Sequence, residues 1–322
     1  WQREYARAIT DPAELLDLLQ LDPELLAPAR RAGADFGLRV PRAFVAAMQK
    51  GDPDDPLLRQ VLPLGEELED MPGFVSDPVG DLDAARQPGL LQKYQGRVLL
   101  IASGACAVNC RYCFRRHFPY GEENALRRNW EANRDHIRDD QSIREVILSG
   151  GDPLVLPDDP LGAVAREIAA IPHVRRLRIH TRLPVVLPSR VDERLLGWVE
   201  DLDVPVVMVI HANHPAEITP DVGRSLDRLR RAGATLLNQA VLLRGVNDDA
   251  DALAQLSEAL FDHGVLPYYL HLLDPTRGTA HFDVDDTRGE TLVEALRARL
   301  PGFLVPRLVR EIAGEPSKTP IR

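Results

Sequence analysis

The chain of 322 residues is 44% hydrophobic and 27% charged, with a formal net charge of −10. This composition is typical of a globular protein with a sizeable core, and the negative charge argues against nucleic acid or an anionic membrane as the main partner. No run of about 18 apolar residues is present, so no membrane-spanning helix is expected.

The first part of the chain, residues 1–95, is expected to be a mostly helical accessory region. Its segment "DPAELLDLLQL" at 11–21 starts with an Asp cap and a first-turn Pro and has the apolar spacing of a helix. Segments 51–63 and 71–81 are rich in Pro, Gly and Asp, which indicates connecting loops.

From about residue 97, short apolar runs alternate with helical segments. The runs predict six strands, at 97–102, 145–151, 175–182, 205–212, 235–243 and 266–273. The intervening patterns predict helices at 160–171, 192–202, 220–233 and 248–264. Such alternation is typical of an α/β fold with a parallel sheet. Six units are too few for a full eight-fold barrel, so we expect a partial (βα)6 TIM-like barrel over 96–283, followed by a C-terminal helix and short extension at 284–322.

Polar side chains gather where the predicted strands end. Because the carboxyl ends of parallel strands lie on one rim, these residues are expected to surround one site. They are Ser149 to Asp152, His180 to Arg182, His211, Asn213, His214, Asn238, Gln239 and Asp274.

All three cysteines, Cys106, Cys110 and Cys113, lie within "CAVNCRYC" after the first predicted strand. A structural zinc site would need a fourth protein ligand, for which His117 is the nearest candidate. An iron–sulfur cube held by three cysteines would leave one iron open to an exogenous ligand. Clustered cysteines without an apolar leader favour ligation in a reducing cytoplasm over a disulfide framework.

The spacing C-x3-C-x2-C, with Tyr112 before the last cysteine, resembles the signature of radical S-adenosylmethionine (radical SAM) proteins. "CRYCFRRHF", "SGGDPL", "HANHPAEIT", "NQAVLLRGVND", "GTAHF" and "REIAGEPSKTP" occur in the order seen in the lysine 2,3-aminomutase family. The resemblance covers nearly the whole chain. It is strongest to the short bacterial branch that makes (R)-β-lysine for the modification of elongation factor P.

The resemblance implies three cofactors. The cysteines would hold a [4Fe-4S] cluster whose open iron binds S-adenosylmethionine. Segment Ser149, Gly150, Gly151 and Asp152 looks like the one that receives the methionine amine of that cofactor. Pyridoxal 5'-phosphate (PLP) would carry the migrating nitrogen, and Lys318 matches the family's Schiff-base lysine. Only three of the 39 basic residues are lysines, so Lys318 also belongs to a small set of candidate amines.

The resemblance also implies roles for residues at positions that match the family's motifs. His211 and Gln239 match residues around the PLP ring, and Lys93 with Tyr94 matches a basic–aromatic pair near that cofactor. Arg115 matches the arginine that binds the substrate carboxylate, whereas the neighbouring Arg111 and Arg116 are expected in structural ion pairs. Asp274 and Glu311 would bind the distal ammonium of the lysine substrate. Glu311 replaces an aspartate of the longer clostridial enzymes.

The resemblance therefore implies a cytoplasmic isomerase that converts L-α-lysine to (R)-β-lysine. It would need an external electron donor, and a downstream ligase and elongation factor P would be linked to it by pathway. Two alternatives remain at this point. One is the same chemistry on another amino acid such as glutamate, and the other is a zinc-stabilised barrel without enzymatic activity.

Overall fold

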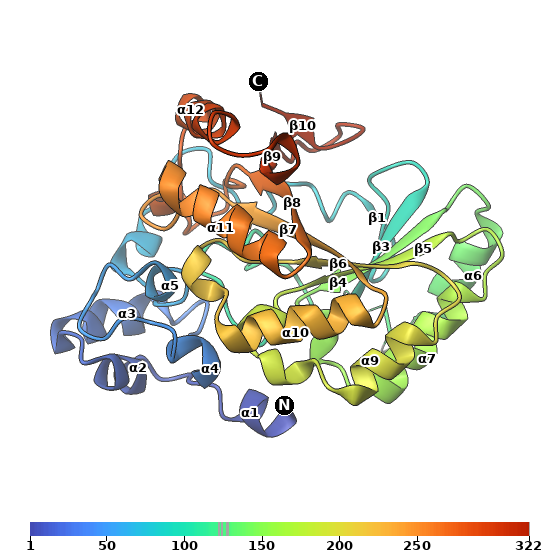
Figure 1. Cartoon of the computed structure of the whole chain (residues 1–322), viewed down its shortest axis with the longest axis horizontal. Helices are drawn as coiled ribbons and strands as arrows, with labels where there is room; N and C mark the ends of the chain where they lie inside the picture. The colour runs from blue at the N-terminus through green and yellow to red at the C-terminus, as the bar shows by residue number, and fades with distance from the viewer. Residues whose placement is uncertain (122, 124, 127–128, 322) are drawn as a thin grey trace.

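The computed structural model describes residues 1–121, 123, 125, 126 and 129–321. Its central feature is a ten-stranded sheet in which the strands follow one another in chain order (Figure 1). The strands are β1 (Ala85–Gln87), β2 (Leu90–Leu91), β3 (Arg97–Ser103), β4 (Glu145–Gly150), β5 (Arg176–Thr181), β6 (Val206–Ile210), β7 (Thr235–Val241), β8 (Val265–His271), β9 (Arg307–Arg310) and β10 (Thr319–Pro320).

Strands β3 to β9 are parallel to one another, whereas β1 and β2 at one end of the sheet and β10 at the other pair antiparallel. The prediction of an α/β fold with a mostly parallel sheet is confirmed, and each of the six predicted strands is present. Strand β9 is a seventh parallel strand that the sequence did not indicate. Within the described residues the sheet is open, with β1 and β10 at its edges. Closure toward a barrel shape stays a prediction.

The helices connect the strands and flank the sheet. The longer ones are α6 (Trp130–Asp139), α7 (Asp158–Ala169), α9 (Glu193–Glu200), α10 (Pro220–Arg231), α11 (Ala250–Asp262) and α12 (Asp286–Arg297). Helix α8 (Leu183–Val186) is a single turn after β5. Figure 1 shows α7, α9, α10 and α11 following the sheet along one side. Local sequence explains their starts: Thr219 caps α10 through the amide of Val222, and Asp249 caps α11. The polar helix α6 was not predicted, because Asn133 and Ile137 are its only buried residues.

The N-terminal region contributes α1 (Gln2–Ala6), α2 (Pro12–Leu19), α3 (Leu26–Ala32), α4 (Arg42–Val45) and α5 (Pro56–Arg59). Asp11 caps α2 with a 3.0 Å bond from the amide of Ala13, as the Asp–Pro pair predicts. Short 3₁₀ helices connect several elements: η1 (Pro23–Leu25), η2 (Gly65–Leu68), η3 (Pro153–Val155), η4 (Pro188–Arg190), η5 (Pro215–Glu217), η6 (Ala280–Phe282) and η7 (Gly302–Leu304).

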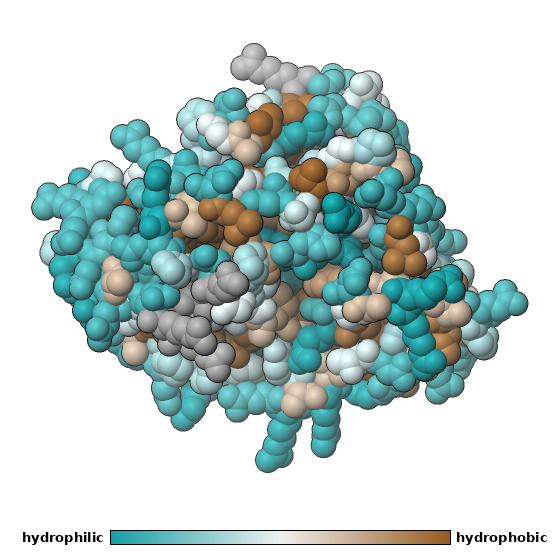
Figure 2. Space-filling view, turned by 180° about the vertical axis from the view of Figure 1, so that it is seen from behind, coloured by the Kyte–Doolittle hydropathy of each residue, from teal (hydrophilic) through white to brown (hydrophobic). Residues whose placement is uncertain are grey.

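The core packs against one face of the parallel strands. Every residue of β4 is buried, but β5 and β7 alternate between buried residues, which belong to the core, and partly buried ones such as Arg178 and Gln239. The partly buried residues of the second face and the carboxyl ends of the strands are therefore the places where polar side chains can converge. The face seen in Figure 2 is mostly hydrophilic, with its hydrophobic residues in small separate groups. None of the helices described here combines the length and the apolarity needed to cross a bilayer.

Candidate active site

A cavity of about 500 Å³ lies at the carboxyl ends of the parallel strands. Its wall takes residues from every strand or following loop from β3 to β8, and from the segments around β9 and β10. The residues to which the resemblance gives a role line it: Lys93, Tyr94, Cys106, Cys110, Cys113, Arg115, Ser149, Gly150, Gly151, Asp152, His211, Gln239, Asp274, Glu311 and Lys318. Three of the polar residues expected at the strand ends, Asn213, His214 and Asn238, do not line it. The fold thus brings together residues that lie up to 225 positions apart, while their individual roles stay predictions.

The three cysteines lie on the loop after β3, and each is a free, partly buried thiol. Burial raises the pKa of the Cys113 thiol to about 11 and raises that of Cys106 as well. Without a metal these sulfurs would stay protonated, whereas bound iron stabilises the thiolate form. Three thiols on one wall of a roomy cavity therefore fit a cluster that has three protein ligands and one open iron.

The cysteine loop is held by the N-terminal region. The amide of Asn109 donates to the carbonyl of Arg39 at 2.9 Å, and the amide of Arg111 donates to the carbonyl of Gln60 at 2.9 Å. The side chains of Arg111 and Arg116 both pair with the buried carboxylate of Glu67, at 2.5 and 2.8 Å. As expected, these two arginines support the loop.

His117, the fourth zinc ligand offered by the sequence, lies away from this wall. Its Nε2 atom approaches the carbonyl oxygen of Arg277 at 3.2 Å, and the residue lines a smaller neighbouring cavity. In the described part of the chain, no three His, Cys, Asp or Glu side chains are arranged around a single metal ion. The structure therefore lends no support to a four-ligand zinc site.

The two glycines after β4 allow that strand end to touch the cysteine loop. A Cβ atom on Gly150, whose φ is +119°, would lie 2.5 Å from the Ser103 carbonyl oxygen. A Cβ on Gly151 would lie 2.4 Å from the Ala105 carbonyl oxygen. The amides of Gly151 and Asp152 donate to these same two oxygens, at 2.7 and 2.8 Å. Close backbone approach therefore explains both glycines.

Asp152 is buried and already surrounded by donors. Its carboxylate accepts from the Thr181 hydroxyl at 2.8 Å and from the Arg182 amide at 2.7 Å, and it caps η3 through the Leu154 amide at 3.0 Å. Burial raises its pKa to about 6 despite these bonds. Asp152 thus joins the ends of β4 and β5, a structural role beyond the predicted contact with S-adenosylmethionine.

Arg115 is positioned by Asp81, a residue that the sequence did not single out. The buried Asp81 carboxylate accepts from Arg115 Nε at 2.6 Å and lies 2.6 Å from Lys93 Nζ. Burial alone would raise the pKa of Asp81, but the charges of Arg115 and Lys93 outweigh that effect and lower it. Arg115 Nη1 also lies 3.2 Å from the Ser149 hydroxyl. Two cations are thereby held at the cavity wall, where they can bind anionic groups.

Lys318 lies next to two acidic residues. Its Nζ atom is 2.5 Å from Glu311 Oε2, and the Tyr94 hydroxyl donates to Glu311 Oε1 at 2.6 Å. Asp274 is partly buried, and its solvent-shielded Oδ1 atom has no hydrogen-bond partner among the described residues. Burial raises the pKa of Asp274 to about 7, against the opposing effect of Lys318. An unpaired carboxylate oxygen at a cavity wall is a place for a cationic group of a ligand.

Three histidines continue this part of the wall: His271 is buried, and His180 and His211 are partly buried. His211 Nε2 lies 3.3 Å from Gln239 Nε2, and burial lowers the pKa of His211 to about 3. Burial also lowers the pKa values of His180 and His271, and the Nε2 atoms of both lack a partner in the described part of the chain. Neutral imidazoles with unused nitrogens, beside the amine of Lys318, fit a polar aromatic cofactor such as PLP.

Some residues of the wall escaped sequence reasoning. Asp81 lies in a loop whose Asp-rich composition indicates only a turn, and His271 lies inside a predicted strand. Arg182 was placed on the polar rim without a role. The signals that could have found them are spatial, because Asp81 and Arg182 act on partners far along the chain and His271 is defined by the cavity that it lines.

Comparisons with known proteins agree with the family resemblance that the sequence motifs indicate. Residues 100–256 match the family model of the Radical SAM superfamily. The chain is 49% identical to L-lysine 2,3-aminomutase of Escherichia coli, over 100% of this chain and 94% of that protein. It is 45% identical to the enzyme of the same name from Haemophilus influenzae, over 99% and 94% of the two chains. With that of Clostridium subterminale it shares 32% identity, over 100% and 77%.

Proposed function

The chain belongs to the L-lysine 2,3-aminomutase family of the radical SAM superfamily, and from this premise we propose that it converts L-α-lysine to β-lysine. The reaction is an isomerisation: the amino group moves from C2 to C3, and one hydrogen moves from C3 to C2. The cofactors are a [4Fe-4S] cluster, S-adenosylmethionine and PLP.

One observation carries the proposal. The three cysteines, the amine of Lys318 and the unpaired carboxylate of Asp274 line the same cavity. Each belongs to a different requirement of the reaction: a cluster, a carrier for nitrogen, and a substrate with a distal positive charge. A site for only one of these groups would not need the other two.

When bound, the cluster and S-adenosylmethionine supply the one-electron chemistry, and PLP supplies the carrier for the migrating amino group. The chain's own residues bind and orient the substrate. Arg115, held by Asp81, offers its guanidinium to the α-carboxylate. Asp274 and Glu311 receive the distal ammonium.

The remaining task of the chain is to protect the reaction. The wall formed by the buried His271 and the partly buried His180 and His211 limits the access of water to the reacting carbons. Positioning of the substrate and exclusion of water are therefore the main contributions of these residues to the rate.

Substrate choice follows from the charge of the distal pocket. A glutamate substrate would present a carboxylate to Asp274 and Glu311, where like charges repel. A lysine substrate presents an ammonium, which pairs with them. This difference favours lysine over the glutamate alternative.

We further propose that the product is (R)-β-lysine and that it serves the modification of elongation factor P through a separate ligase. The support is the resemblance to the short bacterial branch of the family. Free, clustered thiols suit a reducing compartment, so we place the enzyme in the cytoplasm, where a low-potential electron donor is available.

The test is product analysis under anaerobic conditions. The reconstituted, dithionite-reduced enzyme is incubated with S-adenosylmethionine, PLP and either L-lysine or L-glutamate, and the β-isomers are identified by chiral chromatography. We expect (R)-β-lysine from lysine and no product from glutamate. Formation of β-glutamate alone would overturn the substrate assignment, and (S)-β-lysine would overturn the proposed place in elongation factor P modification.

A further inference from the structure

We propose that Arg182 is a positioning residue for the cluster: its buried guanidinium holds Cys110 and makes the cluster easier to reduce. The inference rests on the proposed function only in requiring that the three cysteines hold the [4Fe-4S] cluster. The resemblance assigns no role to this arginine.

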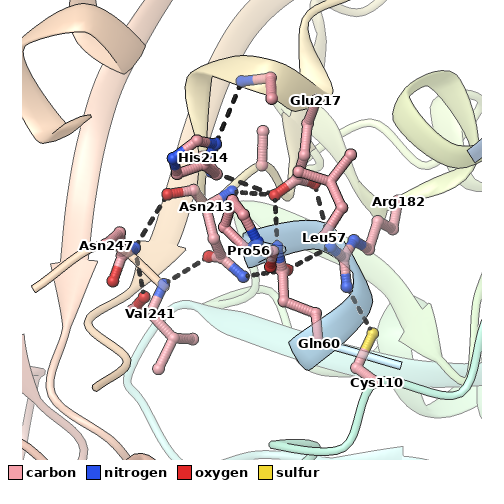
Figure 3. Close-up of polar contacts among 12 residues, drawn as sticks. Pro56, Leu57, Gln60, Cys110, Arg182, Asn213, His214, Glu217, Val241 and Asn247 are labelled. Atoms are coloured by element: carbon pink, nitrogen blue, oxygen red, sulfur yellow. Dashed lines mark hydrogen bonds and ion pairs between the residues drawn. The ribbon is translucent and has the colours of Figure 1, made fainter. Parts of the chain in front are cut away.

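The central contact joins Arg182 to a cluster ligand. Arg182 follows β5 and is 6% exposed. Its Nη1 atom lies 2.8 Å from Cys110 Sγ, and Figure 3 marks this contact with a dashed line. The same atom lies 2.6 Å from the Tyr112 hydroxyl oxygen. The nitrogen and the sulfur are therefore in direct contact, and the positive charge lies against the sulfur.

A second set of contacts fixes the direction of this guanidinium. Its Nη2 atom lies 2.6 Å from Gln60 Oε1 and 3.0 Å from Glu217 Oε2. Glu217 is itself held, because its Oε1 atom accepts from Gln60 Nε2 at 3.0 Å and from the Asn213 amide at 2.9 Å. In Figure 3, Glu217 approaches Arg182 from η5, and Gln60 approaches it from the end of α5. The arginine therefore cannot turn away from Cys110 without breaking several buried bonds.

The physical effect follows from charge. Reduction adds one electron, supplied by an external low-potential one-electron donor, to a cluster in a poorly solvated site. A positive charge that donates a hydrogen bond to a ligand sulfur stabilises the reduced form more than the oxidised form. Glu217 partly offsets this effect, since its negative charge lies on the far side of the guanidinium. Arg182 exchanges no electron itself.

Two substitutions separate the effects of the Arg182 and Glu217 charges on the cluster. Arg182→Met removes the positive charge and the bond to Cys110 while keeping an unbranched apolar stem. Glu217→Gln leaves Arg182 in place and removes its counter-charge. The first change is expected to make the cluster harder to reduce, and the second to make it easier.

Arg190 provides the matched control. It is 0% exposed, lies 2.8 Å from Asp158 through Nη2, and donates through Nε to the Leu154 carbonyl at 2.7 Å. It does not line the cavity. Arg190→Met therefore removes a buried, carboxylate-paired arginine of the same kind away from the cluster.

The experiment is a redox titration of the reconstituted holoenzyme without substrate, with the reduced cluster followed by electron paramagnetic resonance and iron content measured alongside. We expect a more negative midpoint potential in Arg182→Met, a more positive one in Glu217→Gln, and the wild-type value in Arg190→Met. Full iron content with an unshifted potential in Arg182→Met would overturn the inference, as would equal shifts in both arginine variants.

If Arg182→Met does not fold, Glu217→Gln decides alone, and an unchanged or more negative potential refutes the inference. β-Lysine formation by the wild type is measured separately. Opposite shifts in the two variants without β-lysine would contradict the lysine assignment and leave the role of Arg182 standing.

Discussion

Lys318 Nζ lies 2.5 Å from Glu311 Oε2, so the amine assigned to PLP is paired with a carboxylate assigned to the substrate. Both assignments hold if Glu311 exchanges partners. Once the amine is engaged by PLP, the carboxylate that it leaves is available to the distal ammonium of lysine. Glu311 then neutralises one amine in the empty site and another in the loaded one.

Glu311→Gln tests this exchange. We expect the KM for lysine to rise by about 10- to 100-fold, with a smaller change in kcat, because one charge-assisted hydrogen bond contributes about 1.5–3 kcal/mol. Steady-state kinetics measure it. The exposed Glu315, four residues away, supplies the control, and Glu315→Gln is expected to keep the wild-type KM. An unchanged KM in Glu311→Gln would remove this residue from substrate binding.

Lys318→Ala tests the attachment of PLP. Borohydride reduction of the loaded wild type is expected to leave a pyridoxyl group on the peptide that contains Lys318, and the variant is expected to lose it. Peptide mapping by mass spectrometry identifies the labelled residue. Lys50→Arg changes an exposed lysine and serves as the control. This variant is expected to carry the pyridoxyl group on the Lys318 peptide, as the wild type does. A label on Lys50 or Lys93 would contradict the assignment.

The pKa of about 7 for Asp274 predicts a pH dependence of substrate capture. Only the ionised carboxylate pairs with an ammonium, and its fraction increases as the pH rises through 7. Below that value kcat/KM for lysine is expected to fall by about tenfold per pH unit, because this ratio reports groups of the free enzyme. In Asp274→Glu, kcat/KM for lysine is still expected to rise with pH. In Asp274→Asn, kcat/KM is expected to be low and independent of pH in this range. A rising limb near pH 7 in Asp274→Asn would assign it to another group.

Asp81→Asn removes the buried carboxylate between Arg115 and Lys93. We expect the free energy of unfolding to fall by about 3 kcal/mol, since two cations then lose their buried partner. Urea unfolding measures this loss, with exposed Asp83→Asn as the control. A loss in Asp81→Asn no larger than in the control would mean that the two ion pairs add no net stability.

The pH dependence of the Asp81 effect has a definite sign. The folded-state pKa is lowered, so the carboxylate stabilises the fold above its unfolded pKa of about 3.9 and ceases to do so as the pH falls toward the folded value. The difference in stability between wild type and Asp81→Asn is therefore expected to narrow below about pH 4.

Local sequence was sufficient for those parts of the molecule whose signal is local. Apolar, β-branched runs predicted β3 to β8, and the spacing of the cysteines predicted that they share one loop at the cavity, while their role as metal ligands stays a prediction. Strand β9 was missed because "RLVR" is four residues long and carries two arginines, so its pairing with β8 and β10 is what makes it a strand. Asp81 was missed for the same kind of reason, since its partner Arg115 lies 34 residues away.

The resemblance supplied the roles that spacing could not, among them those of Lys318 and Asp274. It did not reveal how the site is supported. The bond from Arg182 to Cys110 and the approach of Gly151 to Ala105 depend on how two strand ends pack, which no local pattern encodes.

Side chains connect the two ends of the open sheet. The cluster loop follows β3, near one edge, and Lys318 immediately precedes β10, at the other. In a closed barrel, hydrogen bonds between the first and last strands would tie these ends together. Here Tyr94, which lies between β2 and β3, donates to Glu311, which follows β9, at 2.6 Å. Residues assigned to PLP and to the substrate therefore also join the two ends of the sheet, so a substitution at Tyr94 or Glu311 acts on the fold as well as on the site.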